Sequence, residues 1–309
     1  MEMNLQKLSE LLRSDTVKNI ILDTDAYNEV DDQFCLAYCM RSPDRVRLLS
    51  VNAAPFLNDR SVSPADGMEK SYQEIFKVMK LVDPEANIPV WRGSDRFLEN
   101  KQTPVESPAA DNIIRTVTES REPVLIVAIG AITNVASALI KRPELAKETA
   151  VIWLGGCALH ANDTTEFNMM QDIAAAQVVF DSGIPLVQIP CEGVCTEMVT
   201  TVPELDHYLG NKNALCDYLV DNVRVECEKF YACSRIIWDI TAAAILICPN
   251  GNRMAEIPRP RITEDSDRPR VCYYANDRTR PHYLYVYKLY RDAIYGDLFR
   301  RLSGGKKGN

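Results

Sequence analysis

The chain has 309 residues, of which 46% are apolar and 25% charged, and its 35 Lys and Arg against 43 Asp and Glu give a formal net charge of −8. This acid excess argues against a nucleic-acid-binding protein, because neutralising phosphates requires a basic surface. No apolar run reaches the length of about 18 residues that a membrane span needs, so we expect no membrane partner either.

The N-terminal stretch, Met1 to Lys18, is short and amphipathic, with Leu5, Leu8, Leu11 and Leu12 as apolar residues. It has neither the apolar core nor the cleavage site of a secretory signal peptide. Ten cysteines in a chain of this length, without such a signal, favour reduced thiols over disulfides. We therefore expect a cytoplasmic protein.

Short apolar runs alternate with helical patterns over the first 190 residues. The alternation predicts an α/β fold with a mainly parallel central sheet flanked by helices, which is a Rossmann-like arrangement. The predicted strands are 19–23, 47–53, 88–91, 124–129, 150–154 and 185–190. The predicted helices are 31–40, 64–81, 109–120, 135–140 and one that begins at 173, behind the N-cap residue Asp172.

After residue 191 the pattern becomes mainly helical. Helices are predicted at 203–209, 213–230, 240–247 and 291–302, a last strand at 283–287, and a solvated surface loop of mixed charge at 258–270. No internal repeat or linker interrupts the chain. We therefore expect a single domain over 1–302, with a helical C-terminal part, followed by a disordered tail at 303–309.

The most informative segment comes after the first predicted strand, where Asp23, Asp25, Glu29, Asp31 and Asp32 lie within ten residues. In α/β sheets the ligand crevice lies beyond the carboxyl ends of the strands. Crowded carboxylates raise one another's pKa, and a bound cation removes that conflict. Flexible carboxylates with a backbone carbonyl suit Ca²⁺ better than Mg²⁺. The alternative is an acid-rich loop in which the last two acids cap a helix.

Several motifs in the same order as in a known family accompany this cluster. The motifs are Asp23-Thr-Asp25 with Asp31-Asp32, then Gly130-Ala-Ile-Thr133-Asn134, Leu154-Gly155-Gly156, Glu166-Phe167-Asn168, Asp172-Ile-Ala-Ala-Ala, and Trp238-Asp239 ahead of Thr241. Together they resemble the inosine–uridine-type nucleoside N-ribohydrolases, and the resemblance extends from about residue 20 to residue 247.

The resemblance implies the nucleoside-hydrolase fold and one Ca²⁺ at the bottom of a pocket. It assigns carboxylate ligands to Asp25, Asp32 and Asp239, and a backbone carbonyl ligand to Thr133. Ribose hydroxyls and one water would complete the coordination, with Asp25 as general base on that water. Thr133 and Asp239 could instead be helix N-caps. The family also implies a homodimer or homotetramer.

The same resemblance assigns the substrate contacts. Asp31 and Asn168 would hold ribose hydroxyls, and Glu166 would contact the 5′ end, with help from Asn162. Asn58 either corresponds to the family's early ribose-binding asparagine or is a turn residue. The expected reaction is hydrolysis of an N-glycosidic bond through an oxocarbenium-like state.

Two departures from the family pattern matter. Five residues, Ala26 to Val30, separate the second and third aspartates where the family usually has three. This enlarged loop places Asn28 and Glu29 beside the expected metal. Asp23 would lie behind the metal ligands. Trp238 stands where many members have a histidine that protonates the leaving base. It either stacks on a purine, which suggests purine nucleosides, or is a core aromatic residue.

Other functions remain open at this point. The enlarged loop is compatible with hydrolysis of another N-riboside or with a catalytically silent protein that binds ribose-containing ligands. A DxD phosphatase fits poorly, because Ala26-Tyr27-Asn28 does not match the residues that such enzymes carry after their DxD. The lone CxxxC of Cys191 and Cys195 lacks zinc-ligand partners, and we interpret both as structural or surface thiols.

Overall fold

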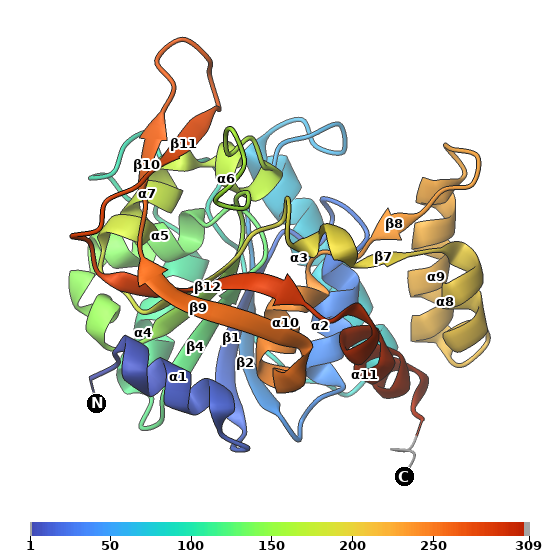
Figure 1. Ribbon diagram of the computed structural model, residues 1–309. Coiled ribbons are helices and arrows are strands. Elements are labelled where there is room, and N and C mark those ends of the chain that lie inside the picture. The colour runs from blue at the N-terminus through green and yellow to red at the C-terminus, as the bar shows by residue number, and fades with distance from the viewer. Residues whose placement is uncertain (1, 306–309) are drawn as a thin grey trace.

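An eight-stranded sheet forms the centre of the computed structural model, which describes residues 2–305 (Figure 1). The strand order is β3-β2-β1-β4-β5-β6-β12-β9, and every neighbouring pair is parallel except β12 with β9. The predicted fold class is confirmed. The strands are β1 Lys18–Thr24, β2 Val46–Ala53, β3 Val90–Trp91, β4 Val124–Ala128, β5 Ala150–Leu154, β6 Leu186–Ile189, β9 Asn252–Pro258 and β12 His282–Leu289.

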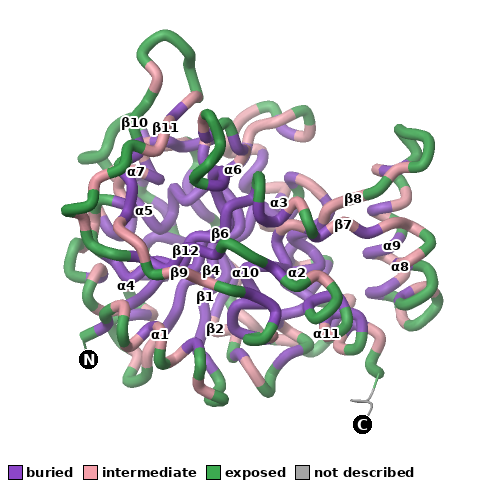
Figure 2. The backbone as a smooth tube through the Cα atoms, viewed as in Figure 1, coloured by how far each residue is buried: buried purple, intermediate pink, exposed green. Residues whose placement is uncertain are grey.

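Helices cover both faces of the sheet because successive strand side chains point to opposite sides. In β1, Ile20 and Leu22 pack into one core while Ile21 packs into the other. The first core receives α1 Leu5–Arg13, α2 Asp32–Met40, α3 Pro64–Val82, α9 Ala214–Cys227, α10 Ile240–Ile247 and α11 Arg291–Ser303. The second receives α4 Pro108–Glu119, α5 Thr133–Lys141 and α7 Ile173–Asp181. The central strands are buried throughout (Figure 2).

The helices begin where capping residues allow them to. Ser63 and Ser107 each accept a backbone N–H from the first turn, and a proline follows each of them. Asp172 accepts the N–H of Ala175 at 2.9 Å, which confirms its predicted role at the start of α7. Two short helices, α6 Phe167–Gln171 and α8 Val202–Tyr208, complete the α-helices of the described chain.

The segment after α10 differs from the prediction. The predicted surface loop at 258–270 is wrong in part, because Arg261–Glu264 forms β10 and pairs with β11 Cys272–Ala275 in an antiparallel hairpin. Strand β9 was not predicted. Exposed residues surround the one buried side chain of β10, Ile262, so that the sequence carries little apolar signal. A second small ladder joins β7 Val199–Thr200 to β8 Arg235–Ile236.

The C-terminal end of the last helix also differs from the prediction. Ser303, predicted as the start of a disordered tail, is the last residue of α11, and Gly304 ends the helix in the left-handed conformation with φ of 74°. The rest of the predicted tail, 306–309, lies outside the described residues. No helix within residues 2–305 combines the length and apolarity needed to cross a membrane.

Candidate functional site

The turn after β1 carries the acidic cluster into the interior. Asp25 comes directly after the strand, and its carbonyl accepts the N–H of Asn28 at 2.7 Å. The Asp25 side chain lies against Gly130, where a Cβ atom would come within 2.7 Å of Asp25 Oδ1. Glycine at 130 is therefore what allows the carboxyl ends of β1 and β4 to approach one another here.

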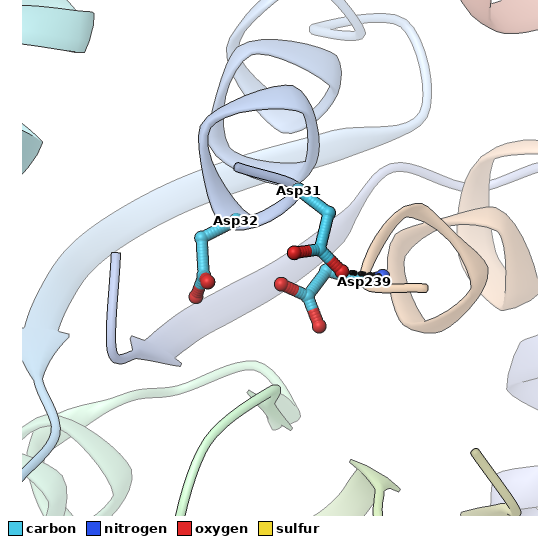
Figure 3. Close-up of side chains that lie close together, drawn as sticks. All are labelled: Asp31, Asp32 and Asp239. Atoms are coloured by element: carbon cyan, nitrogen blue, oxygen red, sulfur yellow. Dashed lines mark hydrogen bonds between the residues drawn. The ribbon is translucent and has the colours of Figure 1, made fainter. Parts of the chain in front are cut away.

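Three carboxylates meet where two helices begin. Asp31 and Asp32 stand at the start of α2 and Asp239 at the start of α10, and each offers an oxygen within 4.8 Å of the others (Figure 3). Asp31 Oδ2 accepts the backbone N–H groups of Trp238 at 3.0 Å and of Asp239 at 3.3 Å, so it ties the two helix starts together. All three carboxylates are buried.

Asp25 completes a cluster of four buried acids. Neither of its carboxylate oxygens has a hydrogen-bond partner among the described residues. Burial, and then the charge of Asp32, raises the pKa of Asp25 well above its usual value. Burial and the charges of Asp31 and Asp32 do the same to the pKa of Asp239. A buried carboxylate with unpartnered oxygens is costly, and a divalent cation would satisfy it, so the donor set fits a hard cation.

The other two acids of the cluster are also shifted. Burial raises the pKa of Asp32 to about 6, against the hydrogen bond from Thr24 that favours its charged form. Burial and the charge of Glu29 raise the pKa of Asp31 to about 8. Without a cation these acids cannot all be ionised near neutral pH.

The residues around the cluster are held by hydrogen bonds. Thr133 begins α5, and its hydroxyl donates to Asp172 at 2.7 Å instead of capping the helix. The Asp239 carboxylate makes no capping bond either, although it stands at the N-cap position. Asp23 accepts from Asn134 Nδ2 at 3.0 Å, its other oxygen has no partner among the described residues, and burial raises its pKa to about 7.

A pocket with about 530 Å³ of empty space, partly open to solvent, lies over this cluster. It brings together eight of the residues singled out from the sequence: Asn28, Glu29, Asp31, Asp32, Glu166, Asn168, Trp238 and Asp239. The remaining five, Asp23, Asp25, Asn58, Thr133 and Asn162, are not part of its lining.

Glu166 and Asn168 are fixed by backbone groups. Glu166 accepts three N–H groups, from Gly156 at 2.5 Å, Asn168 at 2.9 Å and Met169 at 3.0 Å. Burial still raises the pKa of Glu166 above its usual value. Asn168 Nδ2 donates to the carbonyls of Ile129 and Leu154, at the ends of β4 and β5. The donors of Asn168 are thus occupied by the protein.

The two other predicted asparagines do not reach the pocket. Asn58 Nδ2 donates to Asn28 Oδ1 at 2.6 Å, and its Oδ1 accepts the N–H of Arg60, so its side chain braces the enlarged loop. Asn162 is exposed on the loop before Glu166. Glu29 is held at the pocket edge by an ion pair with Arg235.

Sequence reasoning missed part of the pocket wall. Cys191, which the sequence suggested as a structural or surface thiol, is buried and lines the pocket together with Glu166. It lies just past the end of β6, so inspection of the residues after each parallel strand would have found it. The other missed lining residues are Ile129, Leu154, Phe167 and Glu192.

The chain is similar to several known proteins in sequence and in fold. The pyrimidine-specific ribonucleoside hydrolase RihA of Escherichia coli O1:K1 / APEC is 30% identical over 172 residues, which cover 47% of this chain and 55% of RihA. The chain thus spans about half the length of the curated relatives it matches. Among solved structures, a plant nucleoside hydrolase, PpNRh1, has a TM-score of 0.75 at 18% identity, covering 93% of this chain and 99% of that one. A purine-preferring ribonucleoside hydrolase from Gardnerella vaginalis has a TM-score of 0.72 at 21% identity, covering 93% and 98%.

These solved structures share the fold. The sequence profile of the inosine-uridine preferring nucleoside hydrolase family matches residues 20–268. This stretch contains every residue predicted for the site. The chain therefore belongs to the inosine-uridine preferring nucleoside hydrolase family.

Proposed function

We propose that this protein hydrolyses the N-glycosidic bond of ribonucleosides and releases the free base and ribose. The observation that carries the proposal is the cluster of four buried carboxylates, with Asp25 unpartnered among the described residues, beneath a pocket lined by Glu166, Asn168 and Trp238. Family membership gives the reaction class, and the pocket supplies polar groups for a sugar beside an aromatic ring for a base.

Ca²⁺ is the cofactor we propose. Asp25, Asp32 and Asp239 would hold it with their carboxylates and Thr133 with its backbone carbonyl. When bound, Ca²⁺ would lower the pKa of a water and fix the ribose hydroxyls. Asp25 then acts as general base, because a carboxylate in hydrogen-bond reach can accept the proton of the attacking water.

The sugar contacts are inferred from the groups that the protein leaves unused. Asp31 Oδ2 accepts two backbone N–H groups, so its other oxygen remains for a ribose hydroxyl. Glu166 Oε1 accepts one N–H and has a lone pair left for the 5′-hydroxyl. Asn168 contributes its amide oxygen, since both bonds from its Nδ2 go to backbone carbonyls.

We further propose a preference for purines, supported by Trp238. Its side chain is half-buried and contacts both the pocket and the hydrophobic core, so the stacking and core interpretations do not exclude one another. A purine offers the indole a larger ring face than a pyrimidine, and stacking onto it contributes about 1 kcal/mol.

Replacement of Trp238 by leucine tests the purine preference. We expect kcat/KM for inosine to fall about 5- to 10-fold, and kcat/KM for uridine to fall less, because more stacking area is lost with the larger base. Steady-state kinetics on both substrates measures this. An equal or larger loss on uridine would reject the purine preference and favour a pyrimidine substrate, as the name of RihA specifies for that relative.

The reaction itself is tested by reducing-sugar release from a panel of purine and pyrimidine ribonucleosides, each with Ca²⁺ and with a chelator. We expect ribose release that the chelator abolishes. Ligand binding without release from any riboside would instead indicate a catalytically silent binding protein. Phosphate release from a phosphomonoester would favour a phosphatase.

A second candidate substrate class belongs in the same panel. The pocket lining contains no lysine, arginine, histidine or tyrosine among the described residues that could protonate a departing base, while Glu29 and Glu192 add carboxylates. An N-riboside whose base already carries a positive charge, such as a pyridinium riboside, releases a neutral base without a proton donor. Faster hydrolysis of this class than of inosine would favour it.

The proposal also includes a homodimer or homotetramer located in the cytoplasm, in keeping with the family resemblance. Light scattering of the purified protein would give the mass of the assembly. A mass near that of one 34.8-kDa chain would reject the oligomer.

A further inference from the structure

The hairpin of β10 and β11 packs against the loop that leads to Glu166. Cys272, the first residue of β11, accepts with its carbonyl the backbone N–H of Thr164 at 2.9 Å and the Thr164 hydroxyl at 2.7 Å. On the other strand, Ile262 O accepts from Gln177 of α7 at 3.0 Å. The hairpin is thus bonded to the chain two residues before Glu166 and to α7. Figure 1 shows α7 next to the hairpin. Strand β11 lies beyond residue 268, where the match to the family description ends.

A second contact joins the hairpin to the turn at the end of β5. Gln188 of β6 is fully buried, and its Nε2 donates to Gly155 O at 3.0 Å and to the Tyr274 hydroxyl at 2.7 Å. Its Oε1 accepts from Tyr283 at 3.1 Å. Because a carbonyl oxygen can only accept, the contact with Gly155 fixes which way the Gln188 amide faces. Each donor and the acceptor of this side chain therefore has a partner.

Gly156 connects this network to Glu166. It has a φ of 79°, in the left-handed region that favours glycine, and a Cβ atom there would overlap the Tyr274 hydroxyl and approach Gln188 Nε2. Its N–H donates to Glu166 Oε2 at 2.5 Å. The Tyr274 hydroxyl and the Gln188 amide thus pack directly behind the peptide that holds one oxygen of Glu166.

We propose that Tyr274 is a positioning residue for the 5′ end of the substrate, which acts through Gln188 and Gly156 on the carboxylate of Glu166. The inference rests on the proposed function, in which Glu166 accepts the 5′-hydroxyl. Loss of the Tyr274 hydroxyl removes one hydrogen bond from Gln188 and opens space behind Gly156, which lets the peptide and the carboxylate move. The groups that hold Asp31, Asp32 and Asp239 are not part of this network.

The test compares Tyr274→Phe with wild type on a ribonucleoside and on the 5′-deoxyribonucleoside of the same base, at saturating Ca²⁺. For the ribonucleoside we expect kcat/KM to fall about 3- to 10-fold, as for one weakened hydrogen bond. For the 5′-deoxyribonucleoside, which has no 5′-hydroxyl, we expect less than about a 2-fold change by the same reasoning. In a Glu166→Gln background, Tyr274→Phe should add no further loss.

Tyr273→Phe is the matched control. Its hydroxyl lies on the opposite face of β11, where it donates to Asp265 at 2.6 Å near the hairpin tip, so the same chemical change there should leave both substrates unaffected. If Tyr274→Phe folds poorly, Thr164→Val is the second variant. It removes the hydroxyl that donates to Cys272 O and so weakens the contact between the hairpin and the loop before Glu166, and the same selective loss is expected.

The outcomes separate the two proposals. Equal losses on both substrates, or no loss on either, overturn the positioning role while leaving the hydrolase proposal intact. If wild-type protein releases ribose from no riboside, the hydrolase proposal fails and this inference fails with it.

Discussion

Asp25→Ala is expected to lower ribonucleoside hydrolysis by at least about 10³-fold, since a general base alone contributes about 10² to 10⁴ and the same change removes a proposed Ca²⁺ ligand. The variant should also lose the rise in Tm that Ca²⁺ produces in wild type, because stabilisation by a ligand depends on its affinity for the folded state. Kinetics and thermal unfolding, each with Ca²⁺ and with a chelator, measure the two effects.

A variant of the same residue separates loss of metal from loss of fold. In the presence of a chelator, Asp25→Asn should be at least as stable as wild type near neutral pH, because it replaces a buried carboxyl group that is costly to ionise with a neutral amide of similar shape. Asp15→Asn changes the net charge equally at an exposed position and should alter neither activity nor the response to Ca²⁺. Full activity of Asp25→Ala would remove this residue from the mechanism.

The pH dependence of stability is expected to reverse when the cation is added. The pKa values of Asp32, Asp23 and Asp31 are raised to about 6, 7 and 8 in the folded, metal-free protein, against about 3.9 in an unfolded chain. A group with a raised folded-state pKa contributes stability that is fully present below its unfolded value and is lost as pH rises through the folded value. In chelator, the free energy of unfolding should therefore fall between pH 5 and pH 8.

The shifts set the size of this fall. Each pKa unit corresponds to about 1.4 kcal/mol, and with allowance for relaxation of the cluster we expect a loss of at least about 3 kcal/mol across this range. Ca²⁺ binds deprotonated carboxylates, so the stabilisation that it provides should instead grow with pH. Urea unfolding at pH 5 and pH 8, with chelator and with Ca²⁺, measures both slopes. Equal stability at pH 5 and pH 8 in the presence of chelator would contradict the raised pKa values of these buried aspartates.

Local patterns in the sequence determined the parallel strands of the sheet and the acidic residues of the site. Runs such as Val124–Ala128 are apolar at every position, which predicts a strand buried on both faces, and this strand is observed. The aspartates between 23 and 32 come after such a strand, so their place at the carboxyl edge of a parallel sheet could be predicted. Asp172 was recognisable as a helix cap for an equally local reason, because a cap bonds to an N–H only three residues away.

Contacts between distant parts of the chain decided the rest. Asp31 and Asp239 are 208 residues apart, and without the family resemblance no spacing rule would bring them into hydrogen-bond contact. The sheet order places β6 between β5 and β12. This position brings Gln188 into contact with Gly155 and places Cys191, just after β6, in the pocket wall. The hairpin that is hydrogen-bonded to Thr164 could not be predicted from the sequence, because β10 is mostly exposed and has a single buried residue.

The physical reason for the division is the range of the forces involved. Backbone propensity, capping and alternation of apolar residues act over a few positions and are therefore visible in the sequence. Whether Asn58 braces a loop or contacts a sugar, and whether Asn162 reaches the pocket, depends on how loops pack after the sheet has formed. The sequence by itself thus determined the α/β fold and the acidic edge of the sheet, while the tertiary structure decided which side chains close the pocket around it.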